Sequence, residues 1–428
     1  MADPTQEAPR GPLAEPFPEP SAGRPTRGPA PSGGPGARPY HGPNRGPYCG
    51  QGATPYALAG CQGTPVGGHP ACLAHLDEAD RAAYLAALTP GADLDHRGTP
   101  FTQTLLDRLL AAVHDDAERR PRTGAASFAG AVFAGDVDFR GTAFTGAADF
   151  DDATFTGRAD LHGTWFGAAA HFTDARFGGA ADLAGAAFHG EAHLGARFGG
   201  DARFDGACFR GTAEFGTASF GGNAWFGGAE FRGEAWFTEA EFTGNARFGG
   251  AAFAGAADFA DTVFGGDAHF GGAQFGARVR FDRARFGAAR RLGPLVCGGT
   301  VRLDGAEFGA PVTVEIAAAG VSFRRTRWEA PAALRLRRAT VDLAGAVLEH
   351  PVTLVTYPRP FTGPLGDDMG EEPLADRDAQ VHVRSLDGVD AARLTLTDAD
   401  LTGCPLTGVV HLADLRLEDT AELRALTG

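Results

Sequence analysis

A large apolar residue recurs at alternating steps of five and six residues from Phe128 to Leu292. The residue is nearly always Phe, and the series slips once, with a step of four from Leu194 to Phe198. A small or β-branched residue precedes most members by two positions. This period is too short for a helical repeat unit and does not fit the 3.6-residue turn of an α-helix. It predicts a solenoid of short extended segments.

Each unit is expected to form one side of a coil. Residues two apart in an extended segment point to the same side, so the small residue and the Phe both face inward. A Gly follows most Phe residues by two positions, as at Gly135, Gly157, Gly211 and Gly244, and is expected to adopt a positive φ and turn a corner. Four such sides make a coil of about 22 residues. The sequence therefore predicts a mainly β fold, a right-handed quadrilateral β-helix. The predicted core contains Phe128, Phe133, Phe139, Phe144, Phe150, Phe155, Phe166, Phe172, Phe177, Phe204, Phe215, Phe226, Phe237, Phe248, Phe259, Phe270 and Phe281.

Several units match a known repeat closely, namely Ala159-Asp160-Leu161, Ala181-Asp182-Leu183, Ala257-Asp258-Phe259 and Ala399-Asp400-Leu401. They resemble the repeat of the pentapeptide repeat proteins, in which Ala and then Asp or Asn precede an inward Leu or Phe. The resemblance covers most of residues 125–356 and again about 390–412, and it implies the same β-helix. An extra residue in every second unit departs from the strict five-residue repeat and is expected to lengthen two opposite sides of the coil.

Residues 1–123 precede the repeats and divide into a tail and a capping module. Residues 1–46 are rich in Pro and Gly without periodicity and are predicted to be disordered. Residues 47–123 hold a Cys/His loop and two helices. Asp77 is expected to cap a helix at 78–88, and Thr99 to cap a second helix that runs to about Glu118. The helices are expected to cover the open first coil. The module looks like one that precedes the repeats in some actinobacterial family members.

The loop concentrates the residues with metal-binding chemistry. Three Cys and one His fit the ligand set of a structural Zn²⁺ site, and we predict Cys49, Cys61, Cys72 and His69 as its ligands. His75 is assigned to the following helix. Zn²⁺ is the one cofactor that the pattern indicates, and the alternative is a set of reduced cysteines without a metal.

The rest of the chain continues the repeats with one interruption. Residues 124–356 are predicted to form the main β-helix. Residues 357–378 are acidic and Pro-rich and are expected to project from it as a loop. Residues 379–428 are expected to form the last coils and a C-terminal cap. The amphipathic tail from Leu415 to Leu426 either caps the solenoid or forms a homodimer contact.

Charge is uneven along the chain. All 38 basic residues are Arg, and the net charge is −15. Residues 124–261 carry a net charge of −10, whereas residues 262–360 carry +6. Because residues 22 apart stack, Asp138, Asp160 and Asp182 are expected to form one acidic column. Asp149 and Glu214 are expected to belong to a second column on the opposite side. These five acids are the predicted binding surface.

The sequence indicates no enzyme. It contains no phosphate-binding loop, nucleophile elbow or metalloprotease motif, so no catalytic residue is predicted. Asp93, Asp95 and His96 are interpreted as a polar turn. We expect a non-enzymatic scaffold that presents charged faces to a protein partner. The alternative, implied by the resemblance, is a DNA mimic that binds and protects DNA gyrase, as some family members do. The net charge disfavours direct nucleic-acid binding. No membrane span or secretion signal is seen, and a cytoplasmic location is expected.

Overall fold

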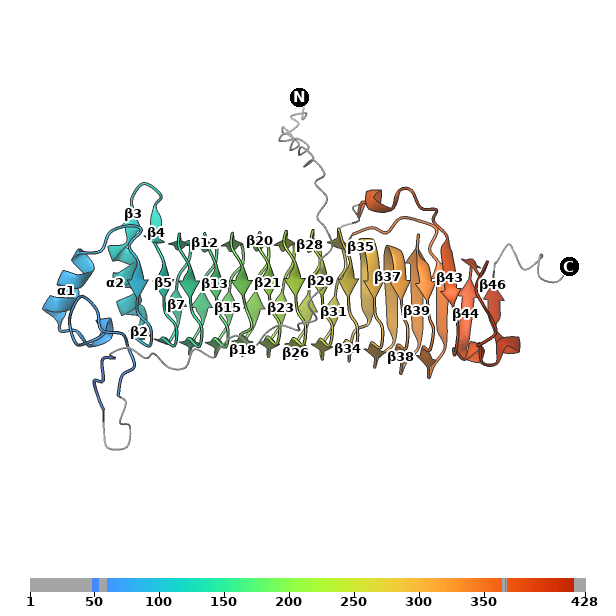
Figure 1. Ribbon diagram of the computed structural model, residues 1–428, viewed down its shortest axis with the longest axis horizontal. Coiled ribbons are helices and arrows are strands. Elements are labelled where there is room, and N and C mark those ends of the chain that lie inside the picture. The colour runs from blue at the N-terminus through green and yellow to red at the C-terminus, as the bar shows by residue number, and fades with distance from the viewer. Residues whose placement is uncertain (1–47, 54–59, 364–365, 367, 419–428) are drawn as a thin grey trace, which may run out of the picture. The chain divides into compact units, whose positions relative to one another are not determined.

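A computed structural model describes residues 48–53, 60–363, 366 and 368–418. The predicted disordered tail at 1–46 lies outside these residues. The described chain is a β-solenoid in which each coil lies on the previous one (Figure 1). Each of the first coils has four short strands, and each strand pairs in parallel with the strand four positions later in the chain. The predicted four-sided coil is confirmed.

The strands fall on four faces of the coil. The first face comprises β2 Pro100–Thr102, β6 Val132–Ala134, β10 Thr154–Phe155, β14 Arg176–Phe177, β18 Arg197–Phe198, β22 Ser219–Phe220, β26 Glu241–Phe242, β30 Val263–Phe264, β34 Arg285–Phe286, β36 Glu307–Phe308, β38 Arg327–Trp328 and β41 Val347–Leu348. The second comprises β7 Val137–Asp138, β11 Ala159–Asp160, β15 Ala181–Asp182, β19 Ala202–Arg203, β23 Ala224–Trp225, β27 Ala246–Arg247 and β31 Ala268–His269. The third comprises β4 Arg120–Thr123, β8 Ala143–Phe144, β12 Trp165–Phe166, β16 Ala187–Phe188, β20 Cys208–Phe209, β24 Glu230–Phe231, β28 Ala252–Phe253 and β32 Ala273–Phe275. The fourth comprises β1 Leu94–Asp95, β5 Ala126–Ser127, β9 Ala148–Asp149, β13 Ala170–His171, β17 Ala192–His193, β21 Ala213–Glu214, β25 Ala235–Trp236, β29 Ala257–Asp258 and β33 Val279–Arg280.

The core is a set of stacked aromatic columns. All the predicted core Phe residues are buried, with at most 2% of their surface exposed. The rings of Phe133 and Phe155 are 4.6 Å apart between centroids, and the same 4.6 Å separates Phe155 from Phe177. The four-residue step is absorbed without breaking this column, because Phe198 stacks on Phe177 at 4.9 Å. This column therefore keeps one ring per coil, whereas Leu161, Leu183 and Leu194 take the place of rings in the neighbouring columns, and the stacked side chains exclude water from the axis.

Only some of the glycines that follow a Phe by two positions adopt the predicted positive φ, as Gly130, Gly141 and Gly228 do. Gly135 has a φ of +79°, but Gly157, Gly211 and Gly244 do not adopt a positive φ. A Cβ at Gly157 would lie 2.4 Å from the backbone carbon of Gly135 in the preceding coil. These three glycines are therefore required by the close approach of successive coils and not by a left-handed corner.

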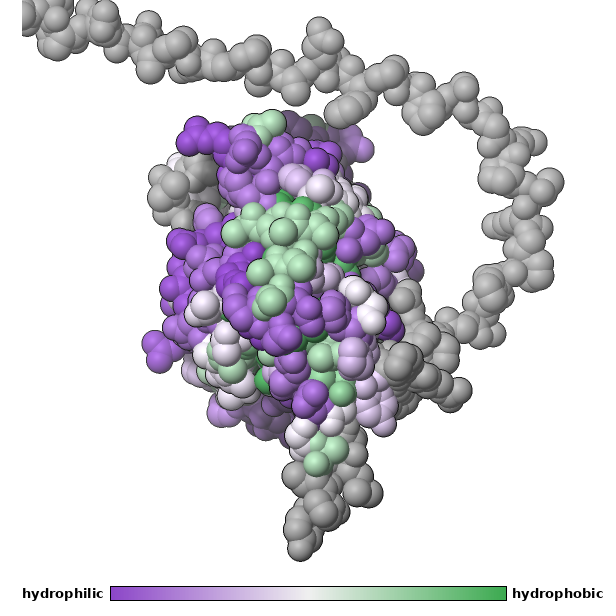
Figure 2. Space-filling model, turned by 90° about the vertical axis from the view of Figure 1, so that its left-hand side faces the viewer, coloured by the Kyte–Doolittle hydropathy of each residue, from purple (hydrophilic) through white to green (hydrophobic). Residues whose placement is uncertain are grey.

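The N-terminal module covers the first coil. It contains η1 Leu73–His75, α1 Glu78–Ala86, α2 Gln103–Ala112 and the short strand β3 His114–Asp115, which is antiparallel to β4. Leu85, Leu106 and Leu109 are buried against the first coil's core. Figure 2 looks onto this end and shows an apolar area surrounded by hydrophilic side chains.

The predicted start of the second helix was wrong. The N-cap of α2 is Thr102, whose hydroxyl accepts a hydrogen bond from Leu105 N, and the helix ends at Ala112. Pro100–Thr102 is extended instead, because Phe101 faces inward and stacks on Phe133 at 5.3 Å. Packing at the end of the Phe column therefore outweighed the local preference for a helix start at Thr99.

The later coils have fewer corners. The strands there are β35 Arg291–Arg302, β37 Val312–Ser322, β39 Ala332–Arg337, β40 Thr340–Asp342, β42 Val352–Thr356, β43 Val381–Ser385, β44 Leu394–Thr397, β45 Ala399–Asp400 and β46 Arg416–Glu418. β35 pairs with both β32 and β33, so one long strand spans two faces. Three short 3-10 turns accompany them, η2 Glu372–Leu374, η3 Ala391–Arg393 and η4 Leu412–Asp414. Only residues 415–418 of the predicted C-terminal tail are described, and they include β46, which pairs with β44.

The loop predicted to project at residues 357–378 packs against the solenoid instead. We name the described residues 357–363, 366 and 368–380 the strap. The strap runs back along the long strands β35 and β37 (Figure 1). Its Phe361, Met369 and Leu374 are buried in one cluster with Val296 and Ala317 of the coils. The long strands turn these two apolar side chains outward, so a cover is needed to remove them from water.

Candidate metal centre and charged ladders

A short hairpin brings the first two cysteines together. Cys49 N donates a hydrogen bond to Gly63 O at 2.9 Å, and Gly50 N donates to Cys61 O at 2.9 Å. Gly63 has to be Gly, because a Cβ there would lie 2.6 Å from Cys72 Cβ. The hairpin arms therefore pass directly against the third cysteine.

A 3-10 turn supplies the other two residues. Cys72 is the N-cap of η1, and His75 N donates to Cys72 O at 2.9 Å. Side chains three apart in a 3-10 turn lie one above the other, which places His75 beside Cys72. Leu73 and Leu76 are buried on either side of the turn and fix its orientation.

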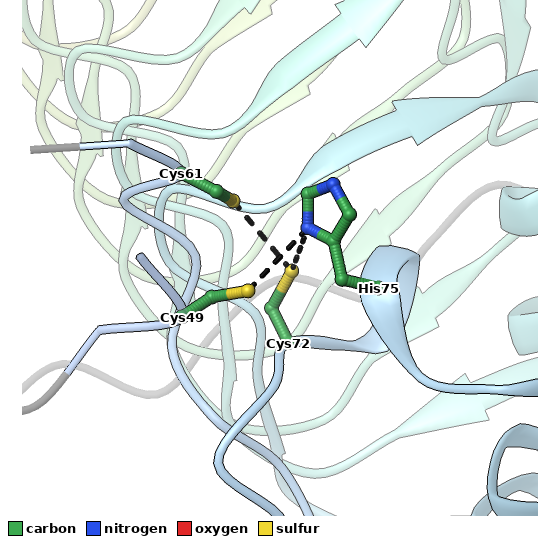
Figure 3. A group of neighbouring side chains, drawn as sticks. All are labelled: Cys49, Cys61, Cys72 and His75. Atoms are coloured by element: carbon green, nitrogen blue, oxygen red, sulfur yellow. Dashed lines mark hydrogen bonds between the residues drawn. The ribbon is translucent and has the colours of Figure 1, made fainter. Parts of the chain in front are cut away.

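Four ligand atoms converge at this point, within 4.8 Å of one another (Figure 3). His75 Nδ1 is 3.4 Å from Cys49 Sγ and 3.4 Å from Cys72 Sγ, and Cys61 Sγ is 3.7 Å from Cys72 Sγ. In a tetrahedral zinc site two sulfurs are about 3.8 Å apart, and a sulfur and a nitrogen are about 3.6 Å apart. The spacing of the four groups therefore fits a metal ion bound at their centre.

The histidine of the cluster is His75 and not the predicted His69. His69 Nδ1 lies 3.2 Å from Asp80 Oδ2, so its ring is directed toward α1. The three predicted cysteines do belong to the cluster. The sequence spacing did not distinguish the two histidines, because the choice depends on a single turn of 3-10 helix between Cys72 and His75.

Burial disfavours the thiolate form of Cys72 when no cation is bound beside it. The pKa of Cys72 is raised to about 12 by its burial and by the nearby Cys61 sulfur. Burial also acts to raise the pKa of Cys49, but hydrogen bonds from Cys72, Gln51 and Cys61 outweigh it, and the net pKa is lowered. A bound cation would favour the thiolate form of both residues.

The predicted acidic column exists, and it is compensated by Arg. Asp138, Asp160 and Asp182 are register partners on β7, β11 and β15. Arg140 pairs with Asp138 at 2.6 Å, and Arg158 lies 2.9 Å from Asp160 and 3.4 Å from Asp182. The column then changes chemistry, continuing through Arg203, Trp225, Arg247 and His269.

The second predicted column also forms. Asp149, His171, His193, Glu214 and Trp236 are successive register partners on the fourth face. The rings of His171 and His193 stack at 4.8 Å, and His193 Nδ1 lies 2.6 Å from Glu214 Oε2. The two columns lie on different faces, so the five predicted binding residues do not form one patch.

Comparison with known families agrees with this architecture. A family model described as pentapeptide repeats (9 copies) matches residues 123–165, 194–241 and 237–285. The coils within these ranges match pentapeptide repeats. No curated protein and no solved structure shows significant similarity to the chain. The family match is confined to coils within residues 123–285 and does not include the N-terminal module or the strap.

Two features of the structure escaped the sequence reasoning. His96 is fully buried among Tyr84, Phe101 and Phe128 instead of lying in a polar turn. Its position two residues after the inward Leu94 was the available signal. The second is Glu371 of the strap, which pairs with Arg337 at 2.7 Å and with Arg338 at 2.8 Å.

Within the described residues, no helix is long and apolar enough to cross a membrane.

Proposed function

We propose that the protein is a non-enzymatic interaction scaffold whose solenoid presents charged side-chain columns to a macromolecular partner. The register of Asp138, Asp160 and Asp182 supports this proposal most directly. Arg140 and Arg158 offset part of this like-charge stacking within the chain, and a partner with a complementary surface would pair with the same row of charges. Charges on the solenoid that face opposite charges on a partner make the binding specific and sensitive to salt, and they add less to the affinity than buried apolar area does.

The test compares two variants of the full chain that lose the same charge. Asp138→Asn, Asp160→Asn and Asp182→Asn are combined in one variant. The control combines Glu230→Gln, Glu239→Gln and Glu241→Gln, which are exposed acids outside this column. We expect the wild-type chain and the control to recover the same partner from a lysate at low salt, and the column variant to lose it. Equal recovery by both variants would contradict the proposal.

A DNA mimic that binds DNA gyrase is the second candidate. The net charge of −10 over residues 124–261 favours it. The pairing of Arg158 with Asp160 and Asp182 weakens it, because a mimic needs a continuous anionic surface. Purified gyrase decides the matter: salt-sensitive binding, with protection of gyrase in a supercoiling assay, is expected of a mimic and not of a scaffold for other proteins.

We propose further that the metal is Zn²⁺ and that its role is structural. Three thiolates and one imidazole are ligands that zinc favours, and four protein ligands leave no open position for a reacting water. Among the described hairpin residues, 48–53 and 60–63, no large apolar side chain is buried, so the metal is the main tie between the hairpin and the capping module. A Cys/His module joined to capping helices supports placing the protein among the actinobacterial members that carry such a module.

Two histidine variants test the ligand set. His75→Ala is expected to lower the zinc content of the purified full chain and to expose the hairpin to protease. His69→Ala, the matched control, is expected to retain zinc. Elemental analysis and limited proteolysis measure the two effects. A chain purified with reduced cysteines and no metal would contradict the zinc site.

A further inference from the structure

The proposed zinc centre of Cys49, Cys61, Cys72 and His75, which we call the clamp, contains two cysteines placed close enough to form a disulfide. Two of its sulfurs, Cys61 Sγ and Cys72 Sγ, are 3.7 Å apart and come from different segments of the chain. Cys61 belongs to the hairpin, and Cys72 belongs to the turn that leads into α1. A disulfide between them would use two of the four ligands and would leave the metal with Cys49 and His75 alone.

The exposure of the two sulfurs assigns their roles. Cys61 is partly exposed, whereas Cys72 is buried. Of these two cysteines, an oxidant therefore reaches Cys61 before Cys72. Cys61 Sγ also accepts a hydrogen bond from Gly63 N at 3.3 Å, which holds the sulfur on the side that faces Cys72. Cys72 lies behind it at a distance that needs only a side-chain adjustment to close.

We propose that a hydroperoxide oxidises Cys61 and Cys72 to a disulfide, that zinc then leaves, and that the Cys49 arm of the hairpin loses its metal tie to the capping module while the Cys61 arm becomes covalently joined to it. This inference rests on the proposed zinc site. It adds redox regulation to a centre whose role is otherwise structural.

The chemistry balances with a peroxide as the two-electron oxidant. The Cys61 thiolate attacks one peroxide oxygen, the O–O bond breaks, and Cys61 becomes a sulfenic acid as hydroxide leaves. The Cys72 thiolate then attacks the Cys61 sulfur, the S–S bond forms, and a second hydroxide leaves. Two thiolates are oxidised and one peroxide is reduced. Zn²⁺ does not change its oxidation state and dissociates because two ligands are lost.

The consequence for the hairpin follows from its other contacts. Its arms remain paired through Cys49 N with Gly63 O and Gly50 N with Cys61 O. The disulfide retains the Cys61 arm against Cys72. The Cys49 arm loses its metal bond and is then held by these backbone hydrogen bonds and by the packing of Cys49 against the core. The change therefore concerns mainly residues 48–53.

The experiment titrates the reduced, zinc-loaded full chain with hydrogen peroxide. A chromophoric chelator measures released zinc, a thiol reagent counts free cysteines, and peptide mass spectrometry locates the disulfide. We expect zinc release in step with the loss of two thiols and a disulfide joining Cys61 to Cys72. A reductant followed by added zinc should restore the starting state. Protease cleavage around residues 48–53 should increase only in the oxidised chain.

Variants of the metal-free reduced chain isolate the pairing. Cys49→Ser is expected to form the Cys61–Cys72 disulfide with peroxide, whereas Cys61→Ser is expected not to form it. Cys208→Ser, outside the cluster, should behave as the wild type. A disulfide through Cys49, or zinc that stays bound under peroxide, overturns the clamp and leaves the zinc site intact. If the reduced chain holds no zinc at all, the zinc site fails and the clamp fails with it.

Discussion

The inward Phe residues show how a single side chain contributes to a stacked core. Phe220 is fully buried, with Phe198 at 4.9 Å below and Phe242 at 4.6 Å above between ring centroids. Its neighbour Ser219 points outward on the same strand. A ring removed from such a column leaves a cavity that the flanking coils cannot close, because their backbones are hydrogen-bonded to one another.

Phe220→Ala is therefore expected to lower the free energy of unfolding by about 3–5 kcal/mol. Ser219→Ala, the matched control one residue away, is expected to change it by less than about 0.5 kcal/mol. Chemical denaturation of the two variants measures both values. Equal losses would mean that the inward and outward positions have been assigned the wrong way round.

His96 gives the first coil a dependence on pH. Burial lowers its pKa to about 4 from the ordinary value of 6.5. The charged groups near it are few: the nearby Asp95 carboxylate acts to raise the pKa but is outweighed, and the Tyr84 hydroxyl lies 3.5 Å from Nε2. The folded protein therefore holds His96 neutral, whereas the unfolded chain takes up a proton below pH 6.5.

The stabilising contribution of neutral His96 is expected to be fully present above pH 6.5 and to be lost as the pH falls to about 4. The loss amounts to about 3 kcal/mol in the free energy of unfolding, because each pKa unit corresponds to about 1.4 kcal/mol. Many carboxylates titrate in the same range, so His96→Leu is the reference. The wild type should lose more stability than this variant over that interval, and parallel pH curves would refute the assignment.

At the scale of elements, two sets of contacts hold the strap against the solenoid: the apolar cluster and the ion pairs of the Glu371 carboxylate. The side chains of Glu371 and Arg337 are only 7% and 6% exposed. Removing one member of a buried ion pair leaves the other without a partner in a medium that solvates it poorly. Arg337 also donates to Pro358 O at 2.9 Å, so the same guanidinium joins both ends of the strap.

Glu371→Gln is expected to cost about 3 kcal/mol of the free energy that keeps the strap closed. Amide hydrogen exchange should quicken at residues 368–380 while the Phe coils stay protected. The neighbouring exposed Glu372 provides the control, and Glu372→Gln should leave exchange unchanged. Unaltered protection in the Glu371 variant would show that the apolar cluster alone holds the strap.

At the scale of the whole molecule, the ends decide whether a solenoid stays soluble. Every internal coil is covered by its neighbours, but the first coil presents Phe128 and Phe133 and an open row of backbone groups. The capping module covers them through Phe101 and the apolar side of α2. An exposed edge of this kind pairs readily with other chains.

A chain that begins at residue 124 is therefore expected to aggregate, whereas one that begins at residue 48 should remain soluble. Light scattering coupled to size-exclusion chromatography distinguishes the two. A monodisperse shorter chain would show that the first coil does not need its cap. The predicted homodimer contact at the C-terminal tail can be read from the same measurement, since residues 419–428 are present in both chains.

The periodic part of the structure was predictable because its causes are local. An inward Phe at steps of five and six determines the coil length, and the coil length alone determines that Asp138 and Asp160 stack. Even the four-residue step after Leu194 was visible in the sequence. The Phe spacing and the coil length repeat from coil to coil, so the prediction for one coil is supported by the same pattern in the next.

The non-periodic features depended on contacts that only the folded chain makes. His75 rather than His69 joins the cysteines because a 3-10 turn places it there. Gly157 is required by the coil beneath it, and the strap closes because Glu371 meets Arg337. Repetition along the chain thus determined the solenoid. Contacts between segments far apart in the chain, which leave no periodic signal, decided the metal cluster and the strap.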